Sequence, residues 1–129
     1  MKEINYLKKG DKISLVAPSF GCTFEPYLTR LQIAIQNFKD DGFVIEEGEN
    51  IYLANHPVRS NTARKCAKEF MKAYEGDSKA IISVGGGEIM CEILPYIDFK
   101  KISKLPHKFF MGFSDNTNLT YTSAMVAKV

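Results

Sequence analysis

Four short apolar runs, separated by longer stretches of helical pattern, are the feature that most constrains the fold of this chain. The runs lie at residues 12–18 (KISLVAP), 43–48 (FVIEEG), 80–87 (AIISVGGG) and 108–114 (KFFMGFS). Their apolar residues are consecutive rather than alternating, a pattern typical of strands buried on both faces of a sheet. Because helices cover both faces of a parallel sheet, we predict that these runs form four strands of one parallel sheet.

The stretches between the first three runs carry apolar residues at helical spacing. In residues 26–41 one stripe is formed by Leu28, Leu31, Ile35 and Phe38, and in residues 60–76 one face is formed by Ala63, Ala67, Phe70, Met71 and Tyr74. This spacing predicts two amphipathic helices. Gly42 and Gly76 are expected to end them, and Ser60 or Asn61 is expected to cap the second.

The second half of the chain predicts three further helices. They lie near residues 88–94, stopped by Pro95, near residues 99–104, and over residues 116–128. The resulting order of strands and helices predicts an α/β fold with a parallel sheet and helices on both faces. No stop signal follows the last helix before Val129, so we expect this chain to be part of a longer protein.

Composition limits the class of protein. The 129 residues suggest one domain, and 45% hydrophobic with 25% charged residues is typical of a soluble globular chain. A net charge of +2 is too small to indicate a nucleic-acid partner, and no apolar run is long enough to span a membrane. The three cysteines, Cys22, Cys66 and Cys91, are widely spaced and predict neither disulfides nor a zinc site, so a cytoplasmic location is expected.

Glycines follow the third strand at its carboxyl end, the edge where ligands bind in open α/β sheets. Gly85, Gly86 and Gly87 let the backbone come close to a ligand and turn its N–H groups outward, toward an oxyanion or a phosphate. The segment is neither a GxGxxG motif nor a P-loop. A plain tight turn between a strand and a helix is the alternative interpretation.

Ser114 follows the fourth strand in the same position. A serine between a buried strand and a helix resembles a nucleophile elbow, in which a sharp turn exposes the hydroxyl group. The usual GxSxG pattern is incomplete, because Gly112 is present but Asn116 replaces the final glycine. The alternative is that Ser114 or Asp115 caps the next helix.

A catalytic serine needs a proton acceptor, and the two histidines of the chain are poor candidates. His107 precedes the fourth strand and Ser114 follows it. The six residues between them, at about 3.3 Å each, place His107 about 20 Å from Ser114. His56 lies in the loop after the second strand, beside Pro57, where a rigid turn is the more common role. The residues therefore predict a nucleophile and an oxyanion hole without a base.

Four segments together resemble the LD-carboxypeptidase family of S66 serine peptidases. They are GDKISLVAPS (10–19), KAIISVGGG (79–87), EILPYIDF (92–99) and FFMGFSDNT (109–117), and they occur in the family's order over almost the whole chain. The resemblance implies a flavodoxin-like three-layer sandwich with a parallel sheet. It also implies that residues 1–129 are the N-terminal domain and that a C-terminal domain is absent from this chain.

The resemblance assigns roles to particular residues. Ser114 would be the nucleophile, and the backbone N–H of Asp115, together with that of Gly86 or Gly87, would form the oxyanion hole. The glutamate and histidine of the family's triad belong to the C-terminal domain, so the isolated chain is expected to be inactive. The family requires no metal or other cofactor.

The implied activity is hydrolysis of the L,D-peptide bond of cytoplasmic murein tetrapeptides through an acyl-enzyme. A microcin-C-type immunity peptidase, which cleaves a peptidyl-nucleotide, is the alternative within the family. A non-catalytic phosphate-binding module is the alternative from another class, although Glu88 follows the glycines where such sites carry a lysine, serine or threonine. The surface that the C-terminal domain would cover is expected to make the isolated chain self-associate as a homodimer.

Overall fold

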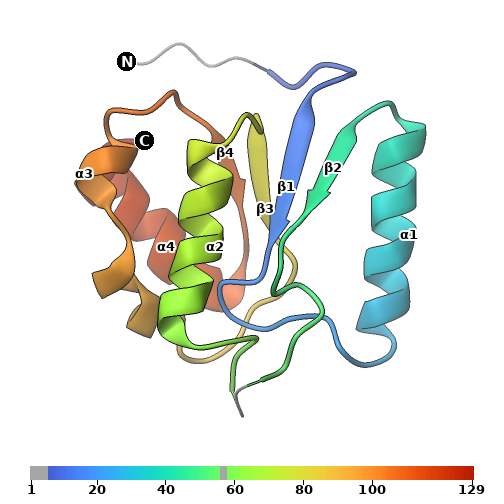
Figure 1. Ribbon diagram of the computed structural model, residues 1–129, viewed down its shortest axis with the longest axis horizontal. Helices are drawn as coiled ribbons and strands as arrows, with labels where there is room; N and C mark the ends of the chain where they lie inside the picture. Colours follow the sequence, from blue (N-terminus) through green and yellow to red (C-terminus); the bar gives the residue numbers. More distant parts are fainter. Residues whose placement is uncertain (1–5, 56–57) are drawn as a thin grey trace.

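The sheet is parallel and has four strands, as the sequence predicted. The computed structural model describes residues 6–55 and 58–129 (Figure 1). The strands are β1 (Lys12–Val16), β2 (Val44–Glu47), β3 (Ala80–Ser83) and β4 (Phe109–Met111), in the order β2-β1-β3-β4. All three pairings are parallel, so the carboxyl ends of the strands meet at one edge of the sheet.

The two long helices form where the apolar stripes predicted them. They are α1 (Tyr27–Asp40) and α2 (Ala63–Glu75). The expected cap of α2 was wrong by one or two residues, since Thr62 is the N-cap and its side chain accepts a hydrogen bond from Lys65 N (3.4 Å). Gly42 follows α1 with φ at +93°, a left-handed conformation that glycine adopts at little cost.

Shorter elements complete the chain. They are the 3₁₀ helices η1 (Met90–Tyr96) and η2 (Ser114–Asn116), the α-helices α3 (Phe99–Ile102) and α4 (Thr117–Thr122), and the π-helical turn η3 (Ser123–Ala127). Pro95 was expected to stop a helix but lies inside η1. A short 3₁₀ segment tolerates this proline because few of its N–H groups are needed for hydrogen bonds.

The helices cover the two faces of the sheet unequally, giving three layers (Figure 1). On one face, α1 places Leu31, Ile35 and Phe38 over Ile13 and Leu15 of β1. On the other face, α2, η1, α3 and α4 form the larger core over the sheet residues Val16, Ile81 and Phe110, with Phe70 and Leu119 among its buried side chains. This arrangement confirms the predicted α/β class.

The two outer strands are more exposed than their apolar sequences suggested. In β2 only Ile45 is half-buried, and in β4 only Phe110 is, whereas four of the five residues of β1 are fully buried. The expectation of burial on both faces therefore applies to the inner strands. A strand at the end of the sheet lacks a neighbour on one side and is only partly covered by helices.

Two buried charged side chains connect α2 to its surroundings. The carboxylate of Glu69 accepts the N–H groups of Ala17 (2.8 Å) and Asn50 (2.7 Å), and burial raises its pKa above the ordinary value. At the other end of the helix, Lys108 Nζ donates to the carbonyl oxygens of Ala73 (3.1 Å) and Gly76 (2.5 Å). Both side chains thus bond to backbone groups in or near the interior, where polar groups need partners.

Within residues 6–55 and 58–129, no helix is both long enough and apolar enough to cross a membrane.

Candidate active site

Three loops meet at the carboxyl edge of the sheet, as the strand order requires. They follow β1 (residues 17–23), β3 (residues 84–89) and β4 (residues 112–115). The first two are joined by a hydrogen bond from Phe20 N to Gly86 O (3.1 Å). The first and third are joined by a bond from Ser19 Oγ to Asp115 Oδ2 (2.7 Å). The segments that the sequence selected separately therefore form one site.

Ser114 has the backbone conformation of a nucleophile elbow. Its φ is +58°, in the left-handed region that residues other than glycine rarely adopt and that costs on the order of 1–3 kcal/mol. The residue is exposed, and within the described residues its hydroxyl group makes no hydrogen bond. A Cβ at Gly112 would lie only 2.6 Å from that of Asn116, so the sharp turn requires the glycine two positions before the serine.

The alternative role of Ser114 and Asp115 as helix caps does not match their contacts. Neither η2 nor α4 has a capping hydrogen bond from a side chain. The Asp115 carboxylate instead accepts Ser19 Oγ–H, the N–H of Met90 (2.8 Å) and the amide of Asn118 (3.0 Å). Its partners therefore lie in the β1 loop, at the start of η1 directly after the β3 loop, and in α4.

The glycine loop lies directly against Ser114. A Cβ added at Gly86 would be 3.0 Å from Ser114 Cβ and 3.3 Å from its Oγ, while one added at Gly87 would overlap the Ser19 hydroxyl. Gly87 therefore has no room for a side chain, and a Cβ at Gly86 would press against Ser114. A larger residue would push the loop away from the serine.

Two carbonyl groups of the glycine loop accept hydrogen bonds from residues around the loop. Gly85 O accepts Asn116 Nδ2–H (2.9 Å) and Ser83 Oγ–H (3.0 Å), and Gly86 O accepts the N–H of Phe20. In a trans peptide the next N–H points opposite to the carbonyl. The N–H groups of Gly86 and Gly87 therefore point away from these partners, and among the described residues they donate no hydrogen bond.

The N–H of Asp115 is also unbonded within the described part of the chain. An exposed hydroxyl beside several unpaired backbone donors is an arrangement that can attack a carbonyl group and hold the oxyanion that forms.

His107 does not contribute a base to this arrangement. His107 precedes β4, at the end of that strand opposite to Ser114, and its ring lies 6.4 Å from the ring of Phe109. His56 lies outside the described residues.

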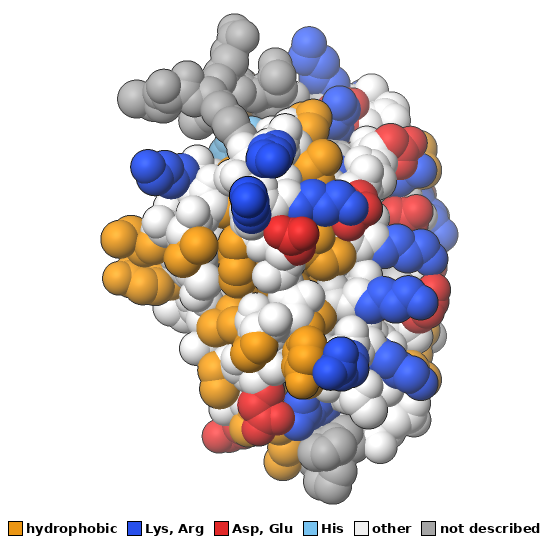
Figure 2. All heavy atoms as spheres, turned by 60° about the vertical axis from the view of Figure 1, so that its left-hand side comes forward, with side chains coloured by type: hydrophobic (Ala, Val, Ile, Leu, Met, Phe, Trp, Pro, Cys, Tyr) orange, Lys and Arg blue, Asp and Glu red, His pale blue; other side chains and the backbone are white. Residues whose placement is uncertain are grey.

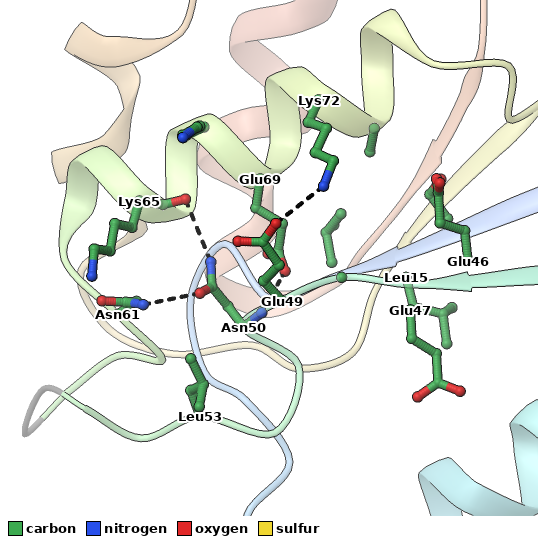
Figure 3. A pocket seen from close by; sticks show the side chains of 15 residues that line it. Leu15, Glu46, Glu47, Glu49, Asn50, Leu53, Asn61, Lys65, Glu69 and Lys72 are labelled. Carbon is green, nitrogen blue, oxygen red and sulfur yellow. Dashed lines mark hydrogen bonds and ion pairs between the residues drawn. The ribbon is translucent and has the colours of Figure 1, made fainter.

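One cavity of the described structure lies away from Ser114. It has a volume of about 320 Å³ and runs along α2 beside β1 and β2 (Figure 3). Three of its charged groups have partners: Lys72 Nζ pairs with Glu49 (3.0 Å), and both oxygens of Glu69 accept backbone N–H groups. The residues that line the cavity include neither Ser114 nor the glycine loop.

Sequence reasoning missed two side chains that build the site. Asn116 looked like a departure from GxSxG, yet it is fully buried and its amide donates to Gly85 O and to Phe113 O (both 2.9 Å). Asp115 was expected to offer its backbone N–H or to cap the next helix, and the other contacts of its carboxylate were not foreseen. The signal was the polar run Ser-Asp-Asn directly after an apolar run, since a polar group that becomes buried, as Asn116 does, needs partners.

Comparison with known proteins identifies the family and the fold of this chain. The sequence profile of the LD-carboxypeptidase N-terminal domain, Peptidase_S66, matches residues 13–128. No match is found among curated protein sequences. The chain resembles microcin C7 self immunity protein MccF in complex with aspartyl sulfamoyl adenosine, with 27% identity, a TM-score of 0.83, and coverage of 92% of this chain and 35% of that one.

Two further solved structures show the same fold. An MccF-like protein from Bacillus anthracis str. Ames is 27% identical, with a TM-score of 0.83 over 95% of this chain and 36% of that one. Muramoyltetrapeptide carboxypeptidase from Oxalobacter formigenes is 27% identical, with a TM-score of 0.64 over 81% of this chain and 33% of that one. The chain spans about a third of the length of these proteins. By its sequence match and its fold, the chain belongs to the S66 LD-carboxypeptidase family.

Proposed function

We propose that this chain is the nucleophile-bearing N-terminal domain of a serine LD-carboxypeptidase. The observation that carries the proposal is the left-handed backbone of Ser114, which holds an exposed hydroxyl group against the glycine loop. A protein gains nothing in stability from such a strained serine, so the strain is explained by the access that it gives to Oγ.

The proposed reaction is acyl transfer through a covalent intermediate. Ser114 Oγ attacks the scissile carbonyl carbon and passes its proton to a base. The oxyanion is held by the N–H of Asp115 and by that of Gly86 or Gly87. The amine leaves with a proton, and water then attacks the acyl-enzyme and regenerates Ser114. The base, a histidine supported by a glutamate, is proposed to come from a C-terminal domain, and no metal or cofactor takes part.

The proposed substrate is a murein tetrapeptide, cleaved at its L,D-peptide bond. The test uses this chain as one polypeptide with the proposed C-terminal domain, and it measures release of the terminal D-amino acid. A fluorophosphonate probe followed by peptide mass spectrometry should locate the adduct on Ser114. Labelling of another residue, or hydrolysis without labelling, would count against the proposal.

A peptidyl-nucleotide is the second candidate substrate, because the MccF structures match the fold more closely than the carboxypeptidase does. Their TM-scores are 0.83 to 0.86, against 0.64 for the muramoyltetrapeptide carboxypeptidase. Comparing kcat/KM for an LD-tetrapeptide and an aminoacyl sulfamoyl adenosine on one preparation decides between the two. If neither is cleaved and the protein binds inorganic phosphate, the phosphate-binding alternative is favoured.

The isolated 129-residue chain is expected to hydrolyse neither substrate measurably. Without the general base the hydroxyl of Ser114 stays protonated and is a weak nucleophile, and loss of the base costs several orders of magnitude in rate. Turnover by the purified chain at a rate comparable to that of the longer protein would contradict the division of the site between two domains.

Self-association of the isolated chain is expected through the β4 patch, which consists of Phe109, Met111 and Phe113. These side chains are 38%, 66% and 71% exposed at an open edge of the sheet. In Figure 2, which brings forward the side that carries α3 and α4, hydrophobic side chains protrude on the left, whereas Lys and Arg side chains concentrate on the right. Exposed apolar groups at a sheet edge favour association.

Light scattering should therefore give a dimeric mass at high concentration, which Met111→Lys lowers toward the monomer. Ile33→Lys is the matched control, since Ile33 is a 54% exposed apolar side chain on α1. A monomeric mass at high concentration would contradict the expectation. We further propose a location in the reducing cytoplasm, on the ground that all three cysteines are unpaired.

A further inference from the structure

The side chain of Asp115 connects the nucleophile to the two other loops of the site. Its Oδ2 accepts the hydroxyl of Ser19 from the β1 loop and the N–H of Met90 at the end of the β3 loop. Its Oδ1 accepts the amide of Asn118 from α4. The residue directly after the candidate nucleophile thus makes three side-chain hydrogen bonds. None of them caps η2 or α4, while the bond from Met90 N lies at the start of η1.

Two of these contacts fix the glycine loop from opposite ends. The Ser19 hydroxyl occupies the space where a Cβ of Gly87 would be, so the position of Ser19 limits where Gly87 can move. The bond to Met90 N anchors the loop three residues further along the chain. The part of the loop that carries the unpaired N–H groups is therefore held between two partners of one carboxylate.

We propose that the Asp115 side chain is a positioning residue that sets the distance between the oxyanion-binding amides and Ser114. This inference rests on the proposed function, since it assumes that these amides bind the oxyanion. Asp115 supplies its own N–H, and its carboxylate also holds the glycine loop in place. The N–H of Asp115 and that of Gly86 or Gly87, the two donors of the proposed oxyanion hole, therefore keep a fixed position relative to each other. A donor displaced by about 1 Å loses much of its effect on the rate.

The role is geometric rather than electrostatic. A carboxylate near a developing oxyanion opposes it by charge, and here the charge is compensated by three donors. An asparagine at this position can keep its oxygen toward Ser19 and Met90 and lose only the bond from Asn118. An alanine loses all three bonds. The two variants therefore separate position from charge.

The experiment measures kcat and KM of the active protein, in which this chain is joined to the proposed C-terminal domain. Asp115→Ala is expected to lower kcat about 100-fold, the size of effect seen when one oxyanion-hole donor is lost, with KM changed less than about threefold. Asp115→Asn is expected to retain kcat within about tenfold of the wild type. Asp98→Ala is the matched control, because Asp98 also accepts a backbone N–H (Lys101, 2.8 Å), but at the start of α3.

Ser19→Ala removes a single donor to Asp115 and serves as the second variant if Asp115→Ala does not fold. We expect it to lower kcat several-fold, and we expect its effect in the Asp115→Ala background to vanish, because both changes remove the same contact. An unchanged kcat in both variants overturns the inference, as does an unchanged kcat in Ser19→Ala alone if Asp115→Ala does not fold. A loss that appears in KM alone also overturns it. The inference is also overturned if kcat falls as far in Asp115→Asn as in Asp115→Ala.

Ser114→Ala is measured alongside to separate this inference from the proposed function. If Ser114→Ala remains active, the proposed function fails and the inference fails with it. If Ser114→Ala is inactive while the Asp115 variants keep full kcat, only the positioning role of Asp115 is overturned.

Discussion

Replacing Ser114 with alanine is expected to reduce kcat by at least about 10⁴-fold in the protein that contains this chain and its proposed C-terminal domain. The substitution removes only Oγ, which makes no hydrogen bond with the described residues, so the fold should be retained. Release of a D-amino acid from an LD-tetrapeptide is the measurement. Ser103→Ala is the control, since Ser103 lies after α3, away from the site, where its hydroxyl donates to Lys100 O (2.8 Å), and it should leave kcat unchanged.

The backbone strain at Ser114 adds a second, independent readout to this prediction. Glycine adopts positive φ without the cost that alanine retains, so Ser114→Gly should be more stable than Ser114→Ala by about 1 kcal/mol, although both are inactive. Thermal unfolding of the two variants measures this difference. Substantial activity in either variant would refute the role of Ser114 as nucleophile, and a less stable glycine variant would argue against strain at this position.

Replacing Glu69 with alanine is expected to give the largest loss of stability, roughly 3 to 5 kcal/mol. The change leaves the N–H groups of Ala17 and Asn50 without an acceptor in the interior, at a cost of about 1–3 kcal/mol for each. For a chain of this length the midpoint of thermal unfolding should fall by about 10 °C or more. The stability of Glu69→Gln should lie between that of the wild type and that of Glu69→Ala. The single amide oxygen of glutamine can accept only one of the two hydrogen bonds in the original geometry.

The matched control for Glu69 lies on the same helix. Glu75 pairs with Lys101 (2.8 Å) at the partly exposed end of α2. Partly exposed ion pairs of this kind contribute no more than about 1 kcal/mol, so Glu75→Ala should change the free energy of unfolding only slightly. Equal effects of Glu69→Ala and Glu75→Ala would show that the buried hydrogen bonds contribute no more than the partly exposed pair.

Local sequence pattern was enough to predict the secondary structure of most of the chain. The apolar runs became strands, and the stripe from Leu28 to Phe38 became α1, because burial of a periodic face is decided by residue spacing. The errors were at boundaries. Thr62 rather than Ser60 or Asn61 caps α2, and Pro95 lies within η1, because capping and 3₁₀ geometry depend on the angle at which the chain enters the helix.

The candidate site was predictable in its backbone but not in its side chains. Strand-end glycines and a serine after a buried strand pointed to Gly86, Gly87 and Ser114, and the parallel order placed them at one edge. The contacts of Asp115 could not be read from the sequence, since Ser19 lies 96 positions away along the chain. Which partner a carboxylate finds at that separation depends on the packing of three loops.

The sequence by itself determined the order of strands and helices and the edge of the sheet at which their loops meet, because each depends on patterns within a few positions. Local pattern left Ser114 open between a helix cap and a nucleophile, and the resemblance of four segments to a family favoured the nucleophile. Only the tertiary structure decided how β1, β3 and β4 bring their loops together, why Asn116 replaces a glycine, and that Ser114 is held at positive φ rather than used as a helix cap. These features depend on hydrogen bonds and close contacts between residues distant in sequence, which exist only once the sheet has aligned the ends of its strands.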